Sequence, residues 1–281
     1  MRSLVRAQDG PRDRSRAGTE TFMFYSIGRT IASLGGNDIL AEFEDVADRI
    51  QRSLLDITLP KATGLEIGVR AAPARIVGGD YVDVIERPDR SPIFAIGDAS
   101  GKSLPAALRA IALKYMVRAL ASVLGDDLPT ILTRANEVIC ADIEPDSFVT
   151  FLVATLTDNN RRLIVANGGH DPPLIYRARS ARIDEMEIGG MATGIEPTAR
   201  YREQHASVTH GDVVVFYTDG FTEARSPTGE LFTLAHVKSG LNDYHDLAAQ
   251  ALADALFERI EEHVAGRLTD DATILVIRVR E

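Results

Sequence analysis

The chain has 281 residues, of which 45% are apolar and 26% are charged, and its formal net charge at pH 7 is −10. This acidic balance argues against a nucleic-acid partner, because surfaces that bind DNA or RNA are basic. The single cysteine, Cys140, excludes an intramolecular disulfide and suits a reducing cytoplasm. No stretch approaches the run of about 18 apolar residues that a membrane span needs. The composition therefore predicts a cytoplasmic globular protein with a full hydrophobic core and no membrane segment.

The N-terminal region divides into two predicted segments. Residues 1–20 are rich in arginine and are predicted to form a disordered tail. Residues 21–60 are predicted to be a helical segment with a regulatory or dimerisation role, centred on an amphipathic helix at 38–56. Two interpretations of this helix stay open: it packs on its own domain, or it pairs with a second copy of the chain or with an activator. Its apolar positions are Ile39, Phe43, Val46, Ile50 and Leu54.

Residues 61–281 are predicted to form one α+β domain. Helices are expected at 104–124, 128–143 and 246–265. The strands come in groups and do not alternate strictly with helices, which favours an α+β fold over a doubly wound sheet. The predicted strands are 65–72, 80–87, 92–98, 147–157, 162–168, 173–178, 182–188, 213–218 and 272–279.

Acidic residues lie at the ends of several apolar stretches, beside glycine or another small residue. They are Asp80 and Asp83 in IVGGDYVD, Asp98 in FAIGDAS, Asp219 in VVVFYTDGFTEA, and Asp270 and Asp271 in LTDDATILV. Turn chemistry explains any one of these placements, since Asp and Gly favour turns. Taken together, carboxylates this close to a core would repel one another unless cations neutralised them. The pattern predicts a carboxylate-bound Mg²⁺ or Mn²⁺ site with two ions and, as a reaction class, phosphoester hydrolysis.

Longer motifs follow one another from about residue 46 to the C-terminus. They are VGGDYVD, IGDASGKSLPAAL, FVTFLVATL, NGGHDPPLI, GDVVVFYTDGFTEARSPTGELF and DDATILVIRV. In this order they resemble the SpoIIE/RsbU-like branch of the metal-dependent (PPM, type 2C) serine/threonine protein phosphatases. The resemblance implies a four-layer αββα sandwich with two central antiparallel sheets, preceded by the N-terminal helix, so that residues 61–281 form the phosphatase domain.

The resemblance also implies two Mn²⁺ or Mg²⁺ ions and assigns their ligands. Asp98 would bridge both ions. Asp80 and the backbone carbonyl of Ala99 would bind one ion, and Asp219 and Asp270 would bind the other. A water held between the ions would attack the phosphorus directly, without a phosphoenzyme. On this view Asp98 and Asp219 are catalytic.

His170, in NGGH, is a further candidate catalytic residue, and a structural role in its loop is the alternative. Many type 2C enzymes carry Gly-His after the Asp of the first loop, and that His is a plausible general acid. Here Ala99 and Ser100 stand in those places, so the leaving group must be protonated from elsewhere. Asp83 and Asp271 could support the site by orienting ligands or waters. Lys102 and Arg75 could attract phosphate, but the default interpretation of each is an exposed, solvated side chain.

The branch also suggests a substrate. By analogy it is a phosphorylated STAS-type anti-sigma-factor antagonist, which would place the protein in a partner-switching pathway. Two alternatives stay open. One is a catalytically silent phosphatase-like module used only for binding, which the presence of all the proposed metal acids disfavours. The other is a hydrolase of small phosphoesters.

Overall fold

The computed structural model describes residues 36–55, 57–88, 90–101, 104–143 and 147–280, with side chains from residue 45 onward. The tail predicted over residues 1–20, Lys102, and the side chains of Ile39 and Phe43 lie outside this part. Contacts group Ala47–Glu281 into one compact unit, and the layers of the fold belong to that unit.

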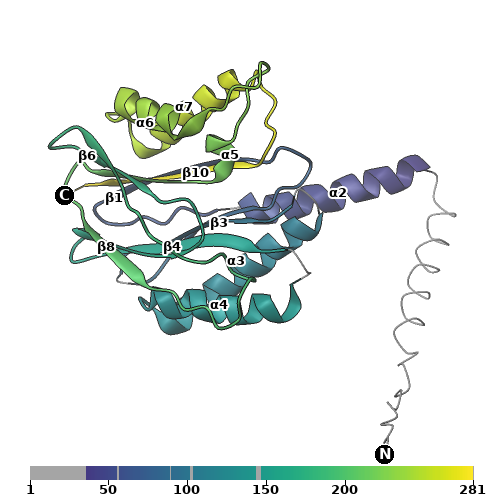
Figure 1. The fold of residues 1–281 in the computed structure, drawn as a ribbon, viewed down its shortest axis with the longest axis horizontal. Helices are drawn as coiled ribbons and strands as arrows, with labels where there is room; N and C mark the ends of the chain where they lie inside the picture. Colours follow the sequence, from purple (N-terminus) through teal and green to yellow (C-terminus); the bar gives the residue numbers. More distant parts are fainter. Residues whose placement is uncertain (1–35, 56, 89, 102–103, 144–146, 281) are drawn as a thin grey trace, which may run out of the picture. The chain divides into compact units, whose positions relative to one another are not determined.

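Two antiparallel sheets of five strands each lie at the centre of the described fold (Figure 1). Sheet A has the order β1-β10-β9-β6-β7, and sheet B has the order β2-β3-β4-β5-β8. Sheet A comprises β1 (Leu65–Ala72), β10 (Ala272–Val279), β9 (Val213–Tyr217), β6 (Leu174–Arg177) and β7 (Arg182–Glu185). Sheet B comprises β2 (Asp80–Ile85), β3 (Ile93–Ala99), β4 (Val149–Thr157), β5 (Arg162–Gly168) and β8 (Glu203–Ser207).

Helices cover the outer face of each sheet, which gives the predicted αββα sandwich (Figure 1). The helices on sheet B are α3 (Leu104–Leu124) and α4 (Leu128–Asp142), and those on sheet A are α5 (Asp219–Thr222), α6 (Thr233–Tyr244) and α7 (Ala249–His263). The N-terminal helix α2 (Gly36–Leu55) joins the sheet B side through Ala47 and Leu54, which are buried there. Within the described residues, no helix has the length and apolar character to cross a membrane.

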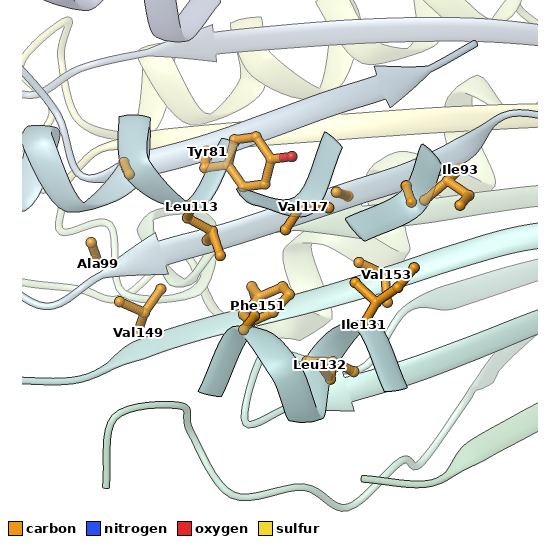
Figure 2. Packing of buried hydrophobic residues seen from close by; sticks show 14 of the residues in the cluster. Tyr81, Ile93, Ala99, Leu113, Val117, Ile131, Leu132, Val149, Phe151 and Val153 are labelled. Carbon is orange, nitrogen blue, oxygen red and sulfur yellow. The ribbon is translucent and has the colours of Figure 1, made fainter. Parts of the chain in front are cut away.

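Buried apolar side chains fill three layers: between sheet B and its helices, between the two sheets, and between sheet A and its helices. Figure 2 shows the first of these, where Tyr81 and Phe151 from the sheet meet Leu113 and Val117 of α3. Neighbouring side chains of a strand point to opposite faces, so Val82 lies in the layer between the sheets. Because both faces are covered, these strands appear in the sequence as unbroken apolar runs.

The predicted elements agree with most of this arrangement. The helices expected at 104–124, 128–143 and 246–265 are α3, α4 and α7. The prediction omitted β8 because its residues are polar and mostly exposed at a sheet edge. It also omitted α5, which is a single turn, and α6, whose inward face is limited to a few apolar residues around Val237 and Leu241.

Candidate metal centre

The strand register places two of the predicted metal ligands side by side. β2 pairs with β3 so that Asp80 is directly opposite Asp98, and β3 pairs with β4 so that Asp98 is opposite Thr150. Directly opposite residues project from the same face of a sheet. Val82, two positions after Asp80, belongs to the core between the sheets. Asp80, Asp98 and Thr150 therefore lie at one end of the layer between the two sheets.

Asp80 is buried, and the opposite sheet supplies its hydrogen bonds. Its Oδ2 atom accepts from the hydroxyl of Thr218 at 2.9 Å and from the hydroxyl of Thr273 at 2.7 Å. Burial raises the pKa of Asp80 well above its usual range, and the carboxylates of Asp98 and Asp271 raise it further, while the two hydroxyls act in the opposite direction. Negative charge is thus gathered where water is excluded, and a bound cation would relieve the repulsion.

Gly79 keeps open the space between the carboxylate of Asp98 and the carbonyl of Ala99. A Cβ on Gly79 would stand 2.6 Å from the Ala99 carbonyl oxygen and 3.2 Å from the Oδ1 atom of Asp98. A side chain here would collide with the backbone oxygen, so the position requires glycine. The Ala99 carbonyl oxygen and the Asp98 Oδ1 atom both border the space left by the missing side chain of Gly79, which we call the glycine cradle. Mg²⁺ and Mn²⁺ prefer oxygen donors such as these.

The acidic side chains alone do not make up a closed coordination sphere. Across the residues whose side chains are described, no three His, Cys, Asp or Glu side chains are grouped so that they could hold a metal ion. A full set of ligands would include backbone oxygen, such as the Ala99 carbonyl, and water, as is usual for Mg²⁺.

The other two predicted ligands come from sheet A. Asp219 follows β9 and begins α5, with Thr218 as the cap residue, and Asp270 lies just before β10. Gly220 brings these two segments together, because a Cβ there would stand only 1.9 Å from the carbonyl oxygen of Asp271. The start of α5 is therefore packed against the turn that holds the half-buried Asp270.

Two threonines connect the two sets of acids, and the sequence reasoning did not single them out. Thr218 directly precedes Asp219, and Thr273 lies at the start of β10, yet both bind Asp80 of sheet B. Their presence in the stretches TDG and DDAT, next to candidate ligands, is the signal that would have found them. Through these bonds, the four predicted carboxylates lie at the same end of the two sheets.

Asp271 supports the backbone that carries Asp80. Its Oδ1 atom accepts from the Ala74 amide at 2.8 Å, and its Oδ2 atom accepts from the Gly79 amide at 2.7 Å. Gly78 is required beside it, because a Cβ there would stand 2.7 Å from the Asp271 carboxylate. A buried carboxylate that accepts two amides of this loop holds Asp80 in place.

Asp83 lies on the opposite face of β2 from Asp80. Its two oxygens accept from Arg118 of α3, with the Nε atom at 2.6 Å and the Nη2 atom at 2.9 Å. The expected support of metal ligands by Asp83 is therefore indirect: this ion pair attaches α3 to the strand that begins at Asp80.

His170 is buried at the same end of the sheets. Its Nδ1 atom lies 3.0 Å from the hydroxyl of Thr150, the residue opposite Asp98. Burial lowers the pKa of His170 to about 4, and the backbone carbonyl of Tyr217 offsets this only in part. The catalytic role expected of His170 stays a prediction. Arg75 is exposed in the loop before β2, as its default interpretation has it, and Lys102 is outside the described residues.

Two cavities open elsewhere on the molecule. Their volumes are about 720 and 790 Å³, and both are lined by Arg87 and Asp126, at the end of sheet B remote from Asp80. Arg87 is already bound to Asp126, Ser91 and Thr155. Neither cavity is lined by a predicted site residue.

Comparisons with known proteins agree with this architecture. The family model of Stage II sporulation protein E (SpoIIE) matches residues 88–280. Phosphoserine phosphatase RsbU of Bacillus subtilis (strain 168) is 27% identical over 257 residues, which cover 91% of this chain and 75% of RsbU. Among solved structures, the SiaA-PP2C domain of Pseudomonas aeruginosa has a TM-score of 0.73 at 19% identity and covers 87% of this chain and 98% of that domain. The catalytic domain of serine threonine protein phosphatase PstP, in complex with 2 manganese ions, has a TM-score of 0.57 at 17% identity and covers 77% of this chain and 99% of its own.

The family match takes in most of the chain. It includes Asp98, Asp219 and Asp270 and begins after Asp80, whose place beside Asp98 comes from the strand register. The two structural matches cover 87% and 77% of this chain. The chain therefore belongs to the SpoIIE family, within the SpoIIE/RsbU-like branch of the type 2C serine/threonine phosphatases.

Proposed function

We propose that this protein is a metal-dependent protein serine/threonine phosphatase that hydrolyses phosphoserine or phosphothreonine on a partner protein. The observation that carries the proposal is the pairing of Asp80 with Asp98 in a buried setting, beside a glycine cradle that presents the Ala99 carbonyl. Kinship with the phosphoserine phosphatase RsbU supports the reaction class. The all-oxygen donors support hard divalent cations, and PstP, which shares the fold, is a complex with 2 manganese ions.

Each ligand has a proposed share in holding two Mn²⁺ or Mg²⁺ ions. Asp98 would contact both ions, Asp80 and the Ala99 carbonyl one of them, and Asp219 and Asp270 the other. When bound, the ions would supply Lewis acidity, which activates water and neutralises phosphate oxygens. Water would attack phosphorus directly as the bond to the serine or threonine oxygen breaks, and the products would be inorganic phosphate and the free hydroxyl.

The remaining residues of the site act by position and charge. Thr218 and Thr273 donate to Asp80 and favour its ionised form, which is the form that binds a cation. Asp271 fixes the loop of Gly79 through two amide bonds, so the cradle beside Ala99 keeps its shape. These contacts preorganise the acidic end of the sheets before a substrate arrives.

The substrate we propose is a phosphorylated STAS-domain protein, an anti-sigma-factor antagonist of a partner-switching pathway in the cytoplasm. The support for this finer assignment is kinship with RsbU and the SpoIIE family. The acidic net charge supports a protein substrate over nucleic acid.

We also propose that α2 transmits regulation, by pairing with a second copy of the chain or with an activator. Its C-terminal half contacts the catalytic domain directly: the Oε1 atom of Gln51 accepts from the Gly78 amide at 2.9 Å. Lys114 of α3 donates to the carbonyls of Ser53 and Leu54 at the end of the helix. A shift of α2 would therefore reach the loop that carries Asp80. Light scattering of the purified protein, alone and with candidate activators, tests the pairing.

The decisive experiment is release of phosphate from a set of phosphoserine STAS proteins, with and without Mn²⁺. The proposal requires turnover by the parent protein, none by Asp98→Asn, and much slower turnover of a generic aryl phosphate. Equal rates on the aryl phosphate and the phosphoprotein would favour a small-molecule hydrolase. If both the parent and the Asp98→Asn variant bind the phosphoprotein tightly but release no phosphate, the catalytically silent binding module is favoured.

A further inference from the structure

The connection from β5 to β6 crosses from sheet B to sheet A beside the candidate centre, and His170 lies within it. Asn167 holds its backbone in place. The Oδ1 atom of Asn167 accepts from the His170 amide at 2.8 Å, and its Nδ2 atom donates to the His170 carbonyl at 2.8 Å. Gly169 supplies the turn before it, with a φ of 77°. These contacts place the imidazole of His170 between the two sheets.

The imidazole of His170 interacts with both sheets. On sheet B its Nδ1 atom lies 3.0 Å from the Thr150 hydroxyl. On sheet A, Leu174 pairs with Val215, so the residues before β6 lie alongside Tyr217. The backbone carbonyl of Tyr217 interacts with the imidazole and raises its pKa slightly against the effect of burial. The ring is buried, and its Nε2 atom makes no hydrogen bond of regular geometry to the described residues. A buried polar ring is costly unless it has partners, and here the partners come from both sheets, which points to a role beyond packing.

Both contacts of this ring lie next to proposed metal ligands. Thr150 is directly opposite Asp98, so the hydroxyl and the carboxylate share one face of sheet B. Tyr217 ends β9, two positions before Asp219. The His170 side chain, held between Thr150 and Tyr217, therefore joins the two sheets close to both acids.

We infer that His170 and Thr150 form a positioning pair that sets the separation of Asp98 on sheet B from Asp219 on sheet A and thereby tunes metal affinity. This inference rests on the proposed function, because a two-ion reaction is what requires the two acids at a set distance. The depressed pKa of His170, about 4, supports it: the ring is neutral at pH 7 and has no extra proton to give to a leaving group.

The test compares matched variants of the full chain. Thr150→Val removes the hydroxyl and keeps the side-chain shape, whereas Thr150→Ser keeps the hydroxyl. His170→Asn leaves an amide near the place of the Nδ1 atom. Ile277→Val is the control, because Ile277 lies in the same layer between the sheets but at the other end of β10 from Thr273. For each protein, Mn²⁺ binding is measured by calorimetry without substrate, alongside phosphoprotein turnover and chemical unfolding.

The inference expects Thr150→Val to bind Mn²⁺ on the order of 10–100-fold more weakly, the usual effect of losing a residue that orients metal ligands. Its kcat falls while its KM for the phosphoprotein stays within about twofold, because substrate contacts are untouched. Thr150→Ser recovers the affinity of the parent. Ile277→Val loses stability and keeps the parent's Mn²⁺ affinity.

Parent-like Mn²⁺ affinity and kcat in Thr150→Val would overturn the inference, as would an equal loss of affinity in Ile277→Val. If Thr150→Val does not fold, His170→Asn is compared with Thr150→Ser in the same way. A parent protein that binds Mn²⁺ but never releases phosphate would refute the proposed function. The affinities of the variants would then still decide whether the pair positions the ligands.

Discussion

Asp80 lies in surroundings that oppose its charge when no cation is bound. It is buried, two other carboxylates act on it, and only two threonine hydroxyls favour its ionised form. The same features suit a metal ligand, since a cation removes the repulsion that the fold has built up. Activity and stability therefore make opposite demands on this residue.

The substitution Asp80→Asn separates those demands. The amide is a weaker ligand for a hard cation, so we expect phosphatase activity to fall to background. It also removes a buried charge, so we expect the metal-free protein to gain about 1–3 kcal/mol in its free energy of unfolding. Urea unfolding in chelator, next to Mn²⁺-dependent turnover, measures both. Retained turnover, or a less stable metal-free variant, would show that Asp80 is not the strained ligand described above.

The neighbours Asp270 and Asp271 differ in what they contact. Asp271 accepts two backbone amides of the loop before β2, whereas Asp270 is half-buried in the turn before β10. We expect Asp270→Ala to abolish activity with little change in stability. We expect Asp271→Ala to destabilise the fold by about 1–3 kcal/mol, because it leaves buried amides unpaired, and to retain more activity per folded molecule. Turnover corrected for the folded fraction decides the order, and the reverse order would mean that the two roles are exchanged.

At this scale the motifs predicted the acids but not their partners. Asp80, Asp98, Asp219, Asp270 and the Ala99 carbonyl were expected at one site, and the register and close packing place their segments at one end of the sheets. Ligation itself stays a prediction. The bonds of Asp80 to Thr218 and Thr273 could not be predicted, because they join residues 138 and 193 positions apart. Periodicity gives the face of a strand but not which distant strand will cover it.

Among the elements, α2 has the most direct connection to the site. Gln51 is the link, since its side chain accepts the amide of Gly78, two residues before Asp80. The buried Lys114 fixes the end of the helix by donating to its last carbonyls. Because the C-terminal part of α2 contacts the loop before Asp80, a movement of the helix would change the position of that loop.

The substitution Gln51→Leu tests this link. It leaves the Gly78 amide unpaired, so we expect about 1 kcal/mol lower stability and a higher Mn²⁺ concentration for half-maximal activity. Arg52→Ala is the matched control, because Arg52 is exposed at the next position of the helix and pairs with Asp48, away from Gly78. We expect its stability to stay within about 0.5 kcal/mol of the parent. If the parent and both variants need the same Mn²⁺ concentration for half-maximal activity, α2 is not coupled to the metal site through Gln51.

The elements that sequence analysis missed share a physical cause. α6 and β8 have few buried apolar residues of their own. Each is stabilised by a neighbouring element that cannot be identified from the local sequence. β8 is held by its ladder with β5, from Arg162 opposite Ser207 to Ala166 opposite Glu203. A long helix with a strong period, such as α2, is predicted well because its own pattern determines it.

For the molecule as a whole, the two sheets meet at a charged end that a cation would join. Removing metal with a chelator should therefore abolish turnover and lower the unfolding temperature, and Mn²⁺ or Mg²⁺ should restore both. With free metal at about 100 times its dissociation constant, we expect a gain of about 2.7 kcal/mol in stability. Calorimetric scans across a metal titration measure it. The Asp98→Asn protein is the control, and a similar gain in that variant would place the stabilising ion elsewhere.

The order of the strands in sheet A also governs when the enzyme can first work. β10, the last of the described strands in chain order, lies between β1 and β9, and its Thr273 hydroxyl binds Asp80. During synthesis the nascent chain thus carries Asp80 and Asp98 long before it has the partner strand that completes their environment. Contacts over such separations form slowly. A chain whose synthesis has not reached β10 lacks Thr273 and its bond to Asp80, so we expect no dephosphorylation before this strand is made.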